Sequence, residues 1–165
     1  MKILPQTVIL SPLFCYSRKR LFEEIAECAS ILINLEPNKI ISLLNERETA
    51  GSTVFSQGIA IPHAVIEDIP QTVSVLSILD KPIAFNSIDA DPQYVDIAWT
   101  VFISSKETYD DIENLLTIMT NELSNQDLLN SLRLARNETP KVQLIIEKLD
   151  LLIQQRKNSP EIEAN

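Results

Sequence analysis

The chain has 165 residues, of which 45% are hydrophobic, and these values predict one globular domain with room for a substantial core. Its 14 basic and 23 acidic side chains give a net charge of −9, which argues against nucleic acid or an anionic membrane as the main partner. No apolar run approaches the roughly 20 residues of a membrane-spanning helix, so we expect no membrane insertion.

The first third of the chain predicts a short strand and two helices. Val8–Leu10 is apolar, and Pro12 is expected to end this strand. Ser17 suits the N-cap of a helix whose core face carries Leu21, Phe22, Ile25, Cys28, Ala29 and Leu32. Pro37 suits the first turn of a second helix, and the end of that helix brings Arg47 close to the segment that follows.

That segment, residues 51–63, holds the only histidine of the chain and both of its glycines. Ile59–Ile61 predicts a short apolar strand, which Pro62 should end, leaving His63 at the end of the strand. Functional side chains often occupy such positions. Taken alone, a single histidine after a strand is more often structural, and only its neighbours make it a candidate for catalysis.

Further strands are expected in the middle of the chain. Thr72–Leu79 alternates polar and apolar residues, which predicts a half-buried strand, and Pro82–Phe85 predicts a short one. Val95–Ile103 is almost continuously apolar and suits a central strand.

The last third predicts helices over Tyr109–Ser124, over Leu128–Ala135 and from Pro140 onward. Leu144 and Leu151 lie off the main apolar stripe of the last helix, so they belong either to the edge of the core or to a self-association surface. The complete pattern predicts an α/β fold of three layers, a mixed β-sheet flanked by helices on both faces. We expect one domain over residues 1–156 and a flexible tail over residues 157–165.

The two cysteines do not indicate a metal or redox site. Cys15 and Cys28 form no CxxC motif and have no histidine nearby in the sequence. We therefore expect no metal, no cofactor and a reduced cytoplasmic setting.

At this point the motifs resemble those of a known family. ERETAGST followed by GIAIPH is similar to the signature of the enzyme IIA domains of the phosphoenolpyruvate-dependent phosphotransferase system, in the fructose and mannitol superfamily and especially its nitrogen-regulatory branch. The resemblance covers about residues 8–155, because LFEEIAE lies before this motif, and KPIAFNSID and then VDIAWTVFI lie after it, in the family's order.

The resemblance implies a role for each matching residue. His63 would accept a phosphoryl group from a histidine phosphocarrier protein, and Arg47 would hold the phosphoryl oxygens during transfer. Ser52 and Thr53 would donate hydrogen bonds to the same oxygens, and Gly58 would let the backbone approach the site. Considered singly, Ser52 and Thr53 are turn or cap residues, Gly58 is a turn or bulge glycine, and Arg47 is a cation at a helix end.

The sequence also departs from the family's pattern. Val54 and Phe55 stand in a stretch that commonly contains glycine, and Ala64 follows His63 where glycine is common. Members often carry a second histidine at the start of the helix after the central strand, where this chain has Tyr109, Asp110 and Asp111. These two carboxylates would either repel a phosphoryl group on His63 or simply complement the helix dipole.

Three hypotheses for function follow. The first is a stand-alone phosphocarrier whose phosphorylation on His63 regulates nitrogen, carbon or potassium physiology through protein targets that the sequence does not identify. The second is a binding module that keeps the fold and regulates partners by contact, without phosphoryl transfer. The third is a sugar-specific IIA subunit of a phosphotransferase transporter. In each case we expect a monomer or a weak homodimer.

Overall fold

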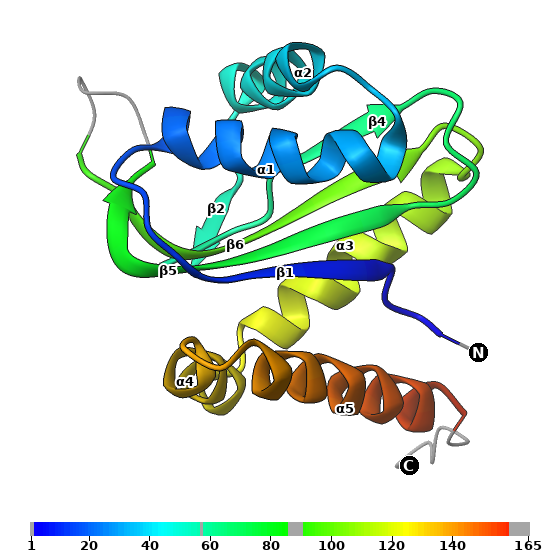
Figure 1. Cartoon of the computed structure of the whole chain (residues 1–165). Helices are drawn as coiled ribbons and strands as arrows, with labels where there is room; N and C mark the ends of the chain where they lie inside the picture. Colours follow the sequence, from blue (N-terminus) through cyan, green and yellow to red (C-terminus); the bar gives the residue numbers. More distant parts are fainter. Residues whose placement is uncertain (1, 57, 86–90, 159–165) are drawn as a thin grey trace.

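A computed structural model describes residues 2–56, 58–85 and 91–158, and at its centre lies one mixed sheet of six strands (Figure 1). In the order in which they lie side by side, the strands are β1 (Gln6–Leu13), β5 (Val73–Ala84), β6 (Tyr94–Ser104), β3 (Gly58–Ala60) and β2 (Val54–Ser56), while β4 (His63–Ile66) also pairs with β6. β1 is parallel to β5, and both β3 and β4 are parallel to β6. The β5–β6 and β2–β3 pairs are antiparallel.

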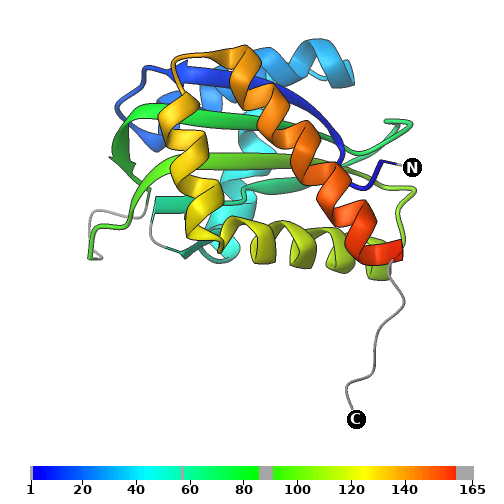
Figure 2. The same cartoon turned by 90° about the horizontal axis from the view of Figure 1, so that it is seen from below.

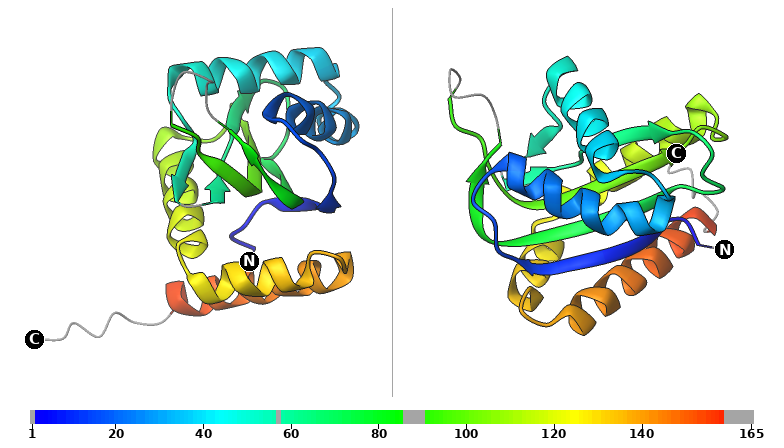
Figure 3. Two further views of the ribbon diagram at one scale, coloured as in Figure 1. Left: turned by 90° about the vertical axis from the view of Figure 1, so that its left-hand side faces the viewer. Right: turned by 45° about the horizontal axis from the view of Figure 1, so that its top comes forward.

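Helices cover both faces of the sheet, which confirms the predicted three-layer α/β fold (Figure 3). α1 (Arg18–Ile33) and α2 (Pro37–Ala50) lie on one face. α3 (Tyr109–Leu123), α4 (Gln126–Ala135) and α5 (Thr139–Asn158) lie on the other face, where α4 and α5 cross the strands and α3 runs roughly along them (Figure 2). Each face has its own cluster of buried apolar side chains, so the sheet is covered by a core on both sides.

The centre of the sheet is more deeply buried than the sequence pattern indicates. Every side chain from Val73 to Leu79 is buried, so the prediction of a half-buried strand is wrong. The alternation misleads because small polar residues of β5 lie inside the protein: Ser74 accepts a hydrogen bond from Trp99 Nε1 at 3.0 Å. β5 also continues to Ala84 and absorbs most of the separate short strand expected over Pro82–Phe85.

Pro12 does not end the first strand. β1 continues to Leu13, with a shift of register against β5 between Leu10 and Leu13. Among the described strands β1 pairs with β5 alone and lies at the edge of the sheet, and Pro12 falls in the register irregularity, a kind of position that tolerates the missing N–H of a proline.

The helix starts follow the local signals. Ser17 is the N-cap of α1 and its hydroxyl oxygen accepts a hydrogen bond from the Arg20 N–H at 3.1 Å. Pro37 occupies the first turn of α2. Both positions agree with the sequence-based expectation.

The end of the chain differs in detail from that expectation. α5 continues through Lys157 to Asn158, and the rest of the expected tail lies outside the described residues. Leu144 and Leu151 are 54% and 56% exposed, so neither belongs to the core. None of the helices within the described ranges is both long and apolar enough to cross a membrane.

Candidate functional site

His63 lies at the sheet edge beside β6, at the start of a strand rather than at the end of one. Ala60 of β3 pairs with Ala98, and His63 of β4 pairs with Val101, so the two short strands continue one line in the same register along β6. Ile61 and Pro62 interrupt this line without shifting it. The prediction that His63 follows the end of the apolar strand therefore needs correction, because pairing with β6 resumes directly after Pro62.

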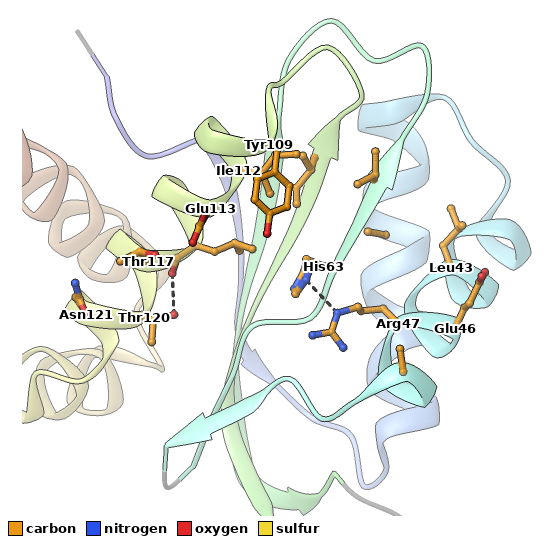
Figure 4. A pocket seen from close by; sticks show the side chains of 15 residues that line it. Leu43, Glu46, Arg47, His63, Tyr109, Ile112, Glu113, Thr117, Thr120 and Asn121 are labelled. Carbon is orange, nitrogen blue, oxygen red and sulfur yellow. Dashed lines mark hydrogen bonds between the residues drawn. The ribbon is translucent and has the colours of Figure 1, made fainter.

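Both ring nitrogens of His63 are hydrogen-bonded, which defines the tautomer of the ring. Figure 4 shows the bond to Arg47. Arg47 Nε donates to His63 Nε2 at 3.1 Å. Since a guanidinium only donates, Nε2 is the unprotonated nitrogen. Nδ1 therefore carries the proton and donates it to the Ile61 carbonyl at 2.9 Å. The lone pair on Nε2 is what an imidazole needs to act as a nucleophile.

Burial lowers the pKa of His63 below 6.5, its ordinary value. The hydrogen bond to the Ile61 carbonyl raises this pKa, the Arg47 charge lowers it, and the Glu48 charge raises it, in that order of size. The net shift is downward, so the ring is neutral and nucleophilic at physiological pH.

An NMR titration of the single histidine should therefore give a midpoint below 6.5. The pKa of His63 is about 6.5 in the unfolded chain and lower in the folded protein. At a pH between these two values the unfolded chain binds more protons than the folded protein, so the free energy of unfolding should fall as the pH drops below about 6.5. The His63→Gln variant should lack this part of the pH dependence. A midpoint above 6.5 in the wild type would contradict the burial argument.

Arg47 reaches His63 from the last turn of α2. Its Nη1 donates to the Gly51 carbonyl at 2.6 Å, and this contact holds the guanidinium across the end of the helix. The side chain is half-buried. The structure thus brings together Arg47 and His63, which lie on different elements.

Neither Ser52 nor Thr53 lines the pocket that His63 lines, and Ser52 Oγ donates instead to Gln93 Oε1 at 3.4 Å. Ser52 Oγ accepts a hydrogen bond from the Val54 N–H at 3.2 Å, as in a turn. Thr53 is buried, and both its N–H and its hydroxyl donate to the Glu48 carboxylate. The hydrogen-bond donors of Thr53 are therefore already engaged in this state of the protein.

Gly58 lies in a different part of the sheet from His63. It lines another cavity, together with Phe55 and Tyr94. Its φ is +88°, and an added Cβ would lie 2.8 Å from Arg133 Nη2 and 3.0 Å from Asp96 Oδ1. Arg133 and Asp96 form a two-pronged ion pair with both contacts at 2.8 Å. Glycine is needed here for backbone conformation and for close packing against this pair, so the expected role near the phosphoryl group is not supported.

Gly58→Ala should destabilise the fold by about 1–3 kcal/mol, because alanine is strained at positive φ and also crowds the ion pair. Gly51→Ala is the matched control: the backbone there is extended and no atom lies within 4 Å of an added Cβ. Denaturant unfolding of both variants measures the difference. Equal stabilities would refute this explanation of Gly58.

A groove of about 800 Å³ opens beside His63, between α2 and α3. Its walls are mostly apolar, with Leu43 from α2 and Ile112 and Leu116 from α3. Tyr109 and Glu113 line it from the first turns of α3, and in Figure 4 the Tyr109 hydroxyl points toward the side of the groove that holds His63. Tyr109 is 78% exposed, so burial in the core does not explain its position.

The acidic residue of α3 in this groove is Glu113, not Asp110 or Asp111. Asp111 lines a separate cavity with Thr72 and Glu107, and Asp110 is exposed and absent from the groove lining. Helical spacing explains the difference, because position 113 lies one turn after Tyr109 on the same face. The sequence contains this signal, but the expectation rested on the first turn alone.

Within the described ranges, no group of three or more histidine, cysteine, aspartate or glutamate side chains gathers as a metal ion would need.

Comparisons with known proteins agree with the motif. Residues 2–148 match the family model described as "Phosphoenolpyruvate-dependent sugar phosphotransferase system, EIIA 2". The chain is 32% identical over 138 residues to a nitrogen regulatory protein of Escherichia coli strain K12, which covers 83% of each chain. A nitrogen regulatory protein of Pseudomonas aeruginosa strain PAO1 is 31% identical over 132 residues, covering 79% of this chain and 84% of the relative.

Solved structures give the same picture. The crystal structure of nitrogen regulatory protein IIA-Ntr from Neisseria meningitidis matches with a TM-score of 0.68 and 27% identity, over 79% of this chain and 88% of that chain. IIA mannitol from Escherichia coli matches with a TM-score of 0.66 over 84% and 94% of the two chains. At 15% identity, this second likeness shows the fold alone.

Proposed function

The chain belongs to the EIIA 2 family of the phosphoenolpyruvate-dependent sugar phosphotransferase system, with relatives in the nitrogen-regulatory branch, and we propose that it is a phosphocarrier that accepts a phosphoryl group on Nε2 of His63. The observation that carries this proposal is the pair of hydrogen bonds on the ring. These bonds leave Nε2 as the nitrogen that carries the lone pair. The pKa of the ring is lowered, and the ring lies beside the Arg47 guanidinium at the wall of an open groove.

The transfer step follows from this geometry. The Nε2 lone pair attacks the phosphorus of a phosphohistidine on the donor protein, and the new N–P bond forms as the donor's N–P bond breaks. The electron pair of the broken bond stays on the donor nitrogen. Positive charge develops on the His63 ring, and the Ile61 carbonyl, which accepts the Nδ1 proton, stabilises it.

Arg47 changes partners during this step. In the unphosphorylated protein its Nε–H occupies the Nε2 lone pair. When the phosphoryl group arrives at Nε2, the Nε–H is released from the ring and, together with Nη2, binds the phosphoryl oxygens, which carry negative charge and match the planar fork of arginine, while Nη1 stays on the Gly51 carbonyl. Arg47 therefore stabilises the transferring group more than the resting site.

The role in the cell rests on the relatives. The relatives from Escherichia coli and Pseudomonas aeruginosa are nitrogen regulatory proteins. We therefore infer that the phosphorylation state of His63 controls how this chain acts on target proteins in the cytoplasm. The donor would be a histidine phosphocarrier protein. Because the net charge is −9, a donor with a basic docking surface fits best.

A reconstituted transfer reaction tests the proposal. Incubation with phosphoenolpyruvate, enzyme I and a cognate histidine phosphocarrier protein should add one phosphoryl group to the intact protein, measured by mass spectrometry. The donor is first shown to be active on another IIA protein. No addition under these conditions would contradict phosphoryl acceptance and would favour regulation by contact alone.

Glu113 should influence the lifetime of the phosphorylated form. Its carboxylate lines the same groove as His63, and negative charge near a phosphoryl group disfavours the phosphorylated product. Glu113→Gln should raise the rate of uptake or prolong the phosphohistidine lifetime about two- to fivefold, the size typical of exposed charges. Asp111→Asn, on the other side of α3, is the matched control and should change neither quantity. Equal effects of the two substitutions would show that only overall charge matters.

A further inference from the structure

Glu48 is linked through hydrogen bonds to the Nδ1 side of the His63 ring, and no step of the proposed transfer uses it. Glu48 follows Arg47 in the last turn of α2 and is half-buried. Both of its carboxylate oxygens bind Thr53: Oε2 accepts the Thr53 N–H at 3.3 Å, and Oε1 accepts the Thr53 hydroxyl. Glu48 thus clamps the backbone at Thr53, just before β2 begins.

The clamp continues from Thr53 to the ring of His63. The Thr53 carbonyl accepts a hydrogen bond from the Ile61 N–H, with an N···O distance of 3.1 Å. The Ile61 carbonyl in turn accepts a hydrogen bond from His63 Nδ1–H, with an N···O distance of 2.9 Å. Ile61 lies between β3 and β4 and belongs to neither strand. The hydrogen bond that the Ile61 N–H donates to the Thr53 carbonyl therefore orients Ile61 at a position where the regular ladder is interrupted.

These contacts form a closed circuit. It leads from Arg47 through Nε2 and Nδ1 of His63 to Ile61, then to Thr53, and returns to the same helix turn at Glu48. Both ring nitrogens are thus linked to the last turn of α2, Nε2 directly through Arg47 and Nδ1 through three successive hydrogen bonds by way of Ile61 and Thr53.

We propose that Glu48 and Thr53 are positioning residues that hold the Ile61 carbonyl at Nδ1 and thereby keep Nε2 of His63 unprotonated for attack. The proposal deepens the proposed function and rests on it for its consequence in catalysis, but the tautomer it concerns is a property of the resting protein. It also assigns Thr53 a role different from direct phosphoryl binding, because its donors point to Glu48.

A purely structural reading of the same contacts makes a different prediction. If the Glu48–Thr53 contact only closes the turn after α2, its loss lowers stability and leaves the tautomer and the transfer rate of the folded protein unchanged. If it positions Ile61, its loss lets the Nδ1 hydrogen bond weaken, and the ring then exchanges between tautomers.

The test uses the full chain labelled with ¹⁵N, in which His63 gives the only imidazole signals. Spectra are recorded without a donor, at a pH above the titration range of histidine. The wild type should show the single tautomer with the proton on Nδ1. Glu48→Ala should show mixed tautomers, and its phosphoryl uptake should slow about 10- to 100-fold, as is typical when outer hydrogen-bond partners of functional histidines are lost.

Two comparisons separate positioning from other effects. Glu48→Gln should restore most of the wild-type signal, because an amide can accept the Thr53 N–H and also bond to its hydroxyl. Glu46→Ala, two positions earlier on α2, removes the same charge type without touching Thr53 and should leave the tautomer unchanged. If Glu48→Ala does not fold, Thr53→Val removes the hydroxyl arm of the clamp and keeps the backbone N–H arm, so it should shift the ring toward mixed tautomers to a smaller extent.

A folded Glu48→Ala or Thr53→Val protein with the wild-type tautomer would overturn the proposal. So would a wild type with the proton on Nε2. A wild type with the expected tautomer that takes up no phosphoryl group from an active donor would instead refute the proposed function and leave the positioning circuit standing.

Discussion

His63→Ala should abolish phosphoryl uptake from an active histidine phosphocarrier protein, while the wild type takes up one group. The expected loss is complete because the chain has one histidine, so no other imidazole can replace its nucleophilic nitrogen. The residue is only partly buried and starts a short strand, so the fold should tolerate alanine. Acid-labile labelling, followed by mass spectrometry, measures the effect.

His63→Gln is a useful companion to that variant. It keeps a polar side chain of similar reach and should be equally inactive. Circular dichroism and thermal unfolding should show that both variants are folded. Undiminished acid-labile labelling of either one would remove His63 from the site.

Arg47→Ala should slow phosphoryl uptake by raising its activation free energy by about 2–4 kcal/mol, which is the usual cost of losing one preorganised charge-stabilising group. This amounts to a factor of tens to about a thousand in rate. The geometric reason is that Arg47 Nε already lies 3.1 Å from the nucleophilic nitrogen, so the guanidinium is in place when the phosphoryl group arrives.

Arg47→Lys should restore only part of the rate. An ammonium supplies charge but lacks the planar fork that binds two oxygens at once. Single-turnover kinetics with a saturating donor separate transfer from docking. A folded Arg47→Ala protein that transfers at the wild-type rate would contradict the role assigned to this residue.

Local signals in the sequence predict the helix starts to within two residues and the order of the helices and longer strands, but not the short strands β2 and β4. Ser17 and Pro37 act through hydrogen bonds and backbone angles within one turn, so they need no tertiary information. Burial on both faces of β5 depends on what packs above and below it. Ser74 is polar yet fully buried because Trp99, 25 positions away, supplies its hydrogen bond.

The candidate site shows the same division. The motif leads to His63 and Arg47, and the structure places them in contact. Gly58 is only five positions from His63, yet it lies at the Asp96–Arg133 pair. The chain is extended between the two residues, so Gly58 pairs with Val95 and His63 pairs with Val101, farther along β6. Thr53 matches the family's motif, but its contact with Glu48 appears only when the end of α2 meets the start of β2. Spacing along the chain therefore identifies the candidate groups, His63 and Arg47, and does not reveal which neighbours hold them.

The most direct test of the central claim is to locate the phosphoryl group on the ring itself. The ¹⁵N-labelled protein is phosphorylated by phosphoenolpyruvate, enzyme I and the histidine phosphocarrier protein, and ¹⁵N and ³¹P NMR then identify the nitrogen bonded to phosphorus. We expect a single phosphohistidine with phosphorus on Nε2 of His63, because Nδ1 is bound to the Ile61 carbonyl. Phosphorus on Nδ1, or the absence of phosphohistidine when the donor is proved active, would contradict the claim that Nε2 of His63 accepts the phosphoryl group.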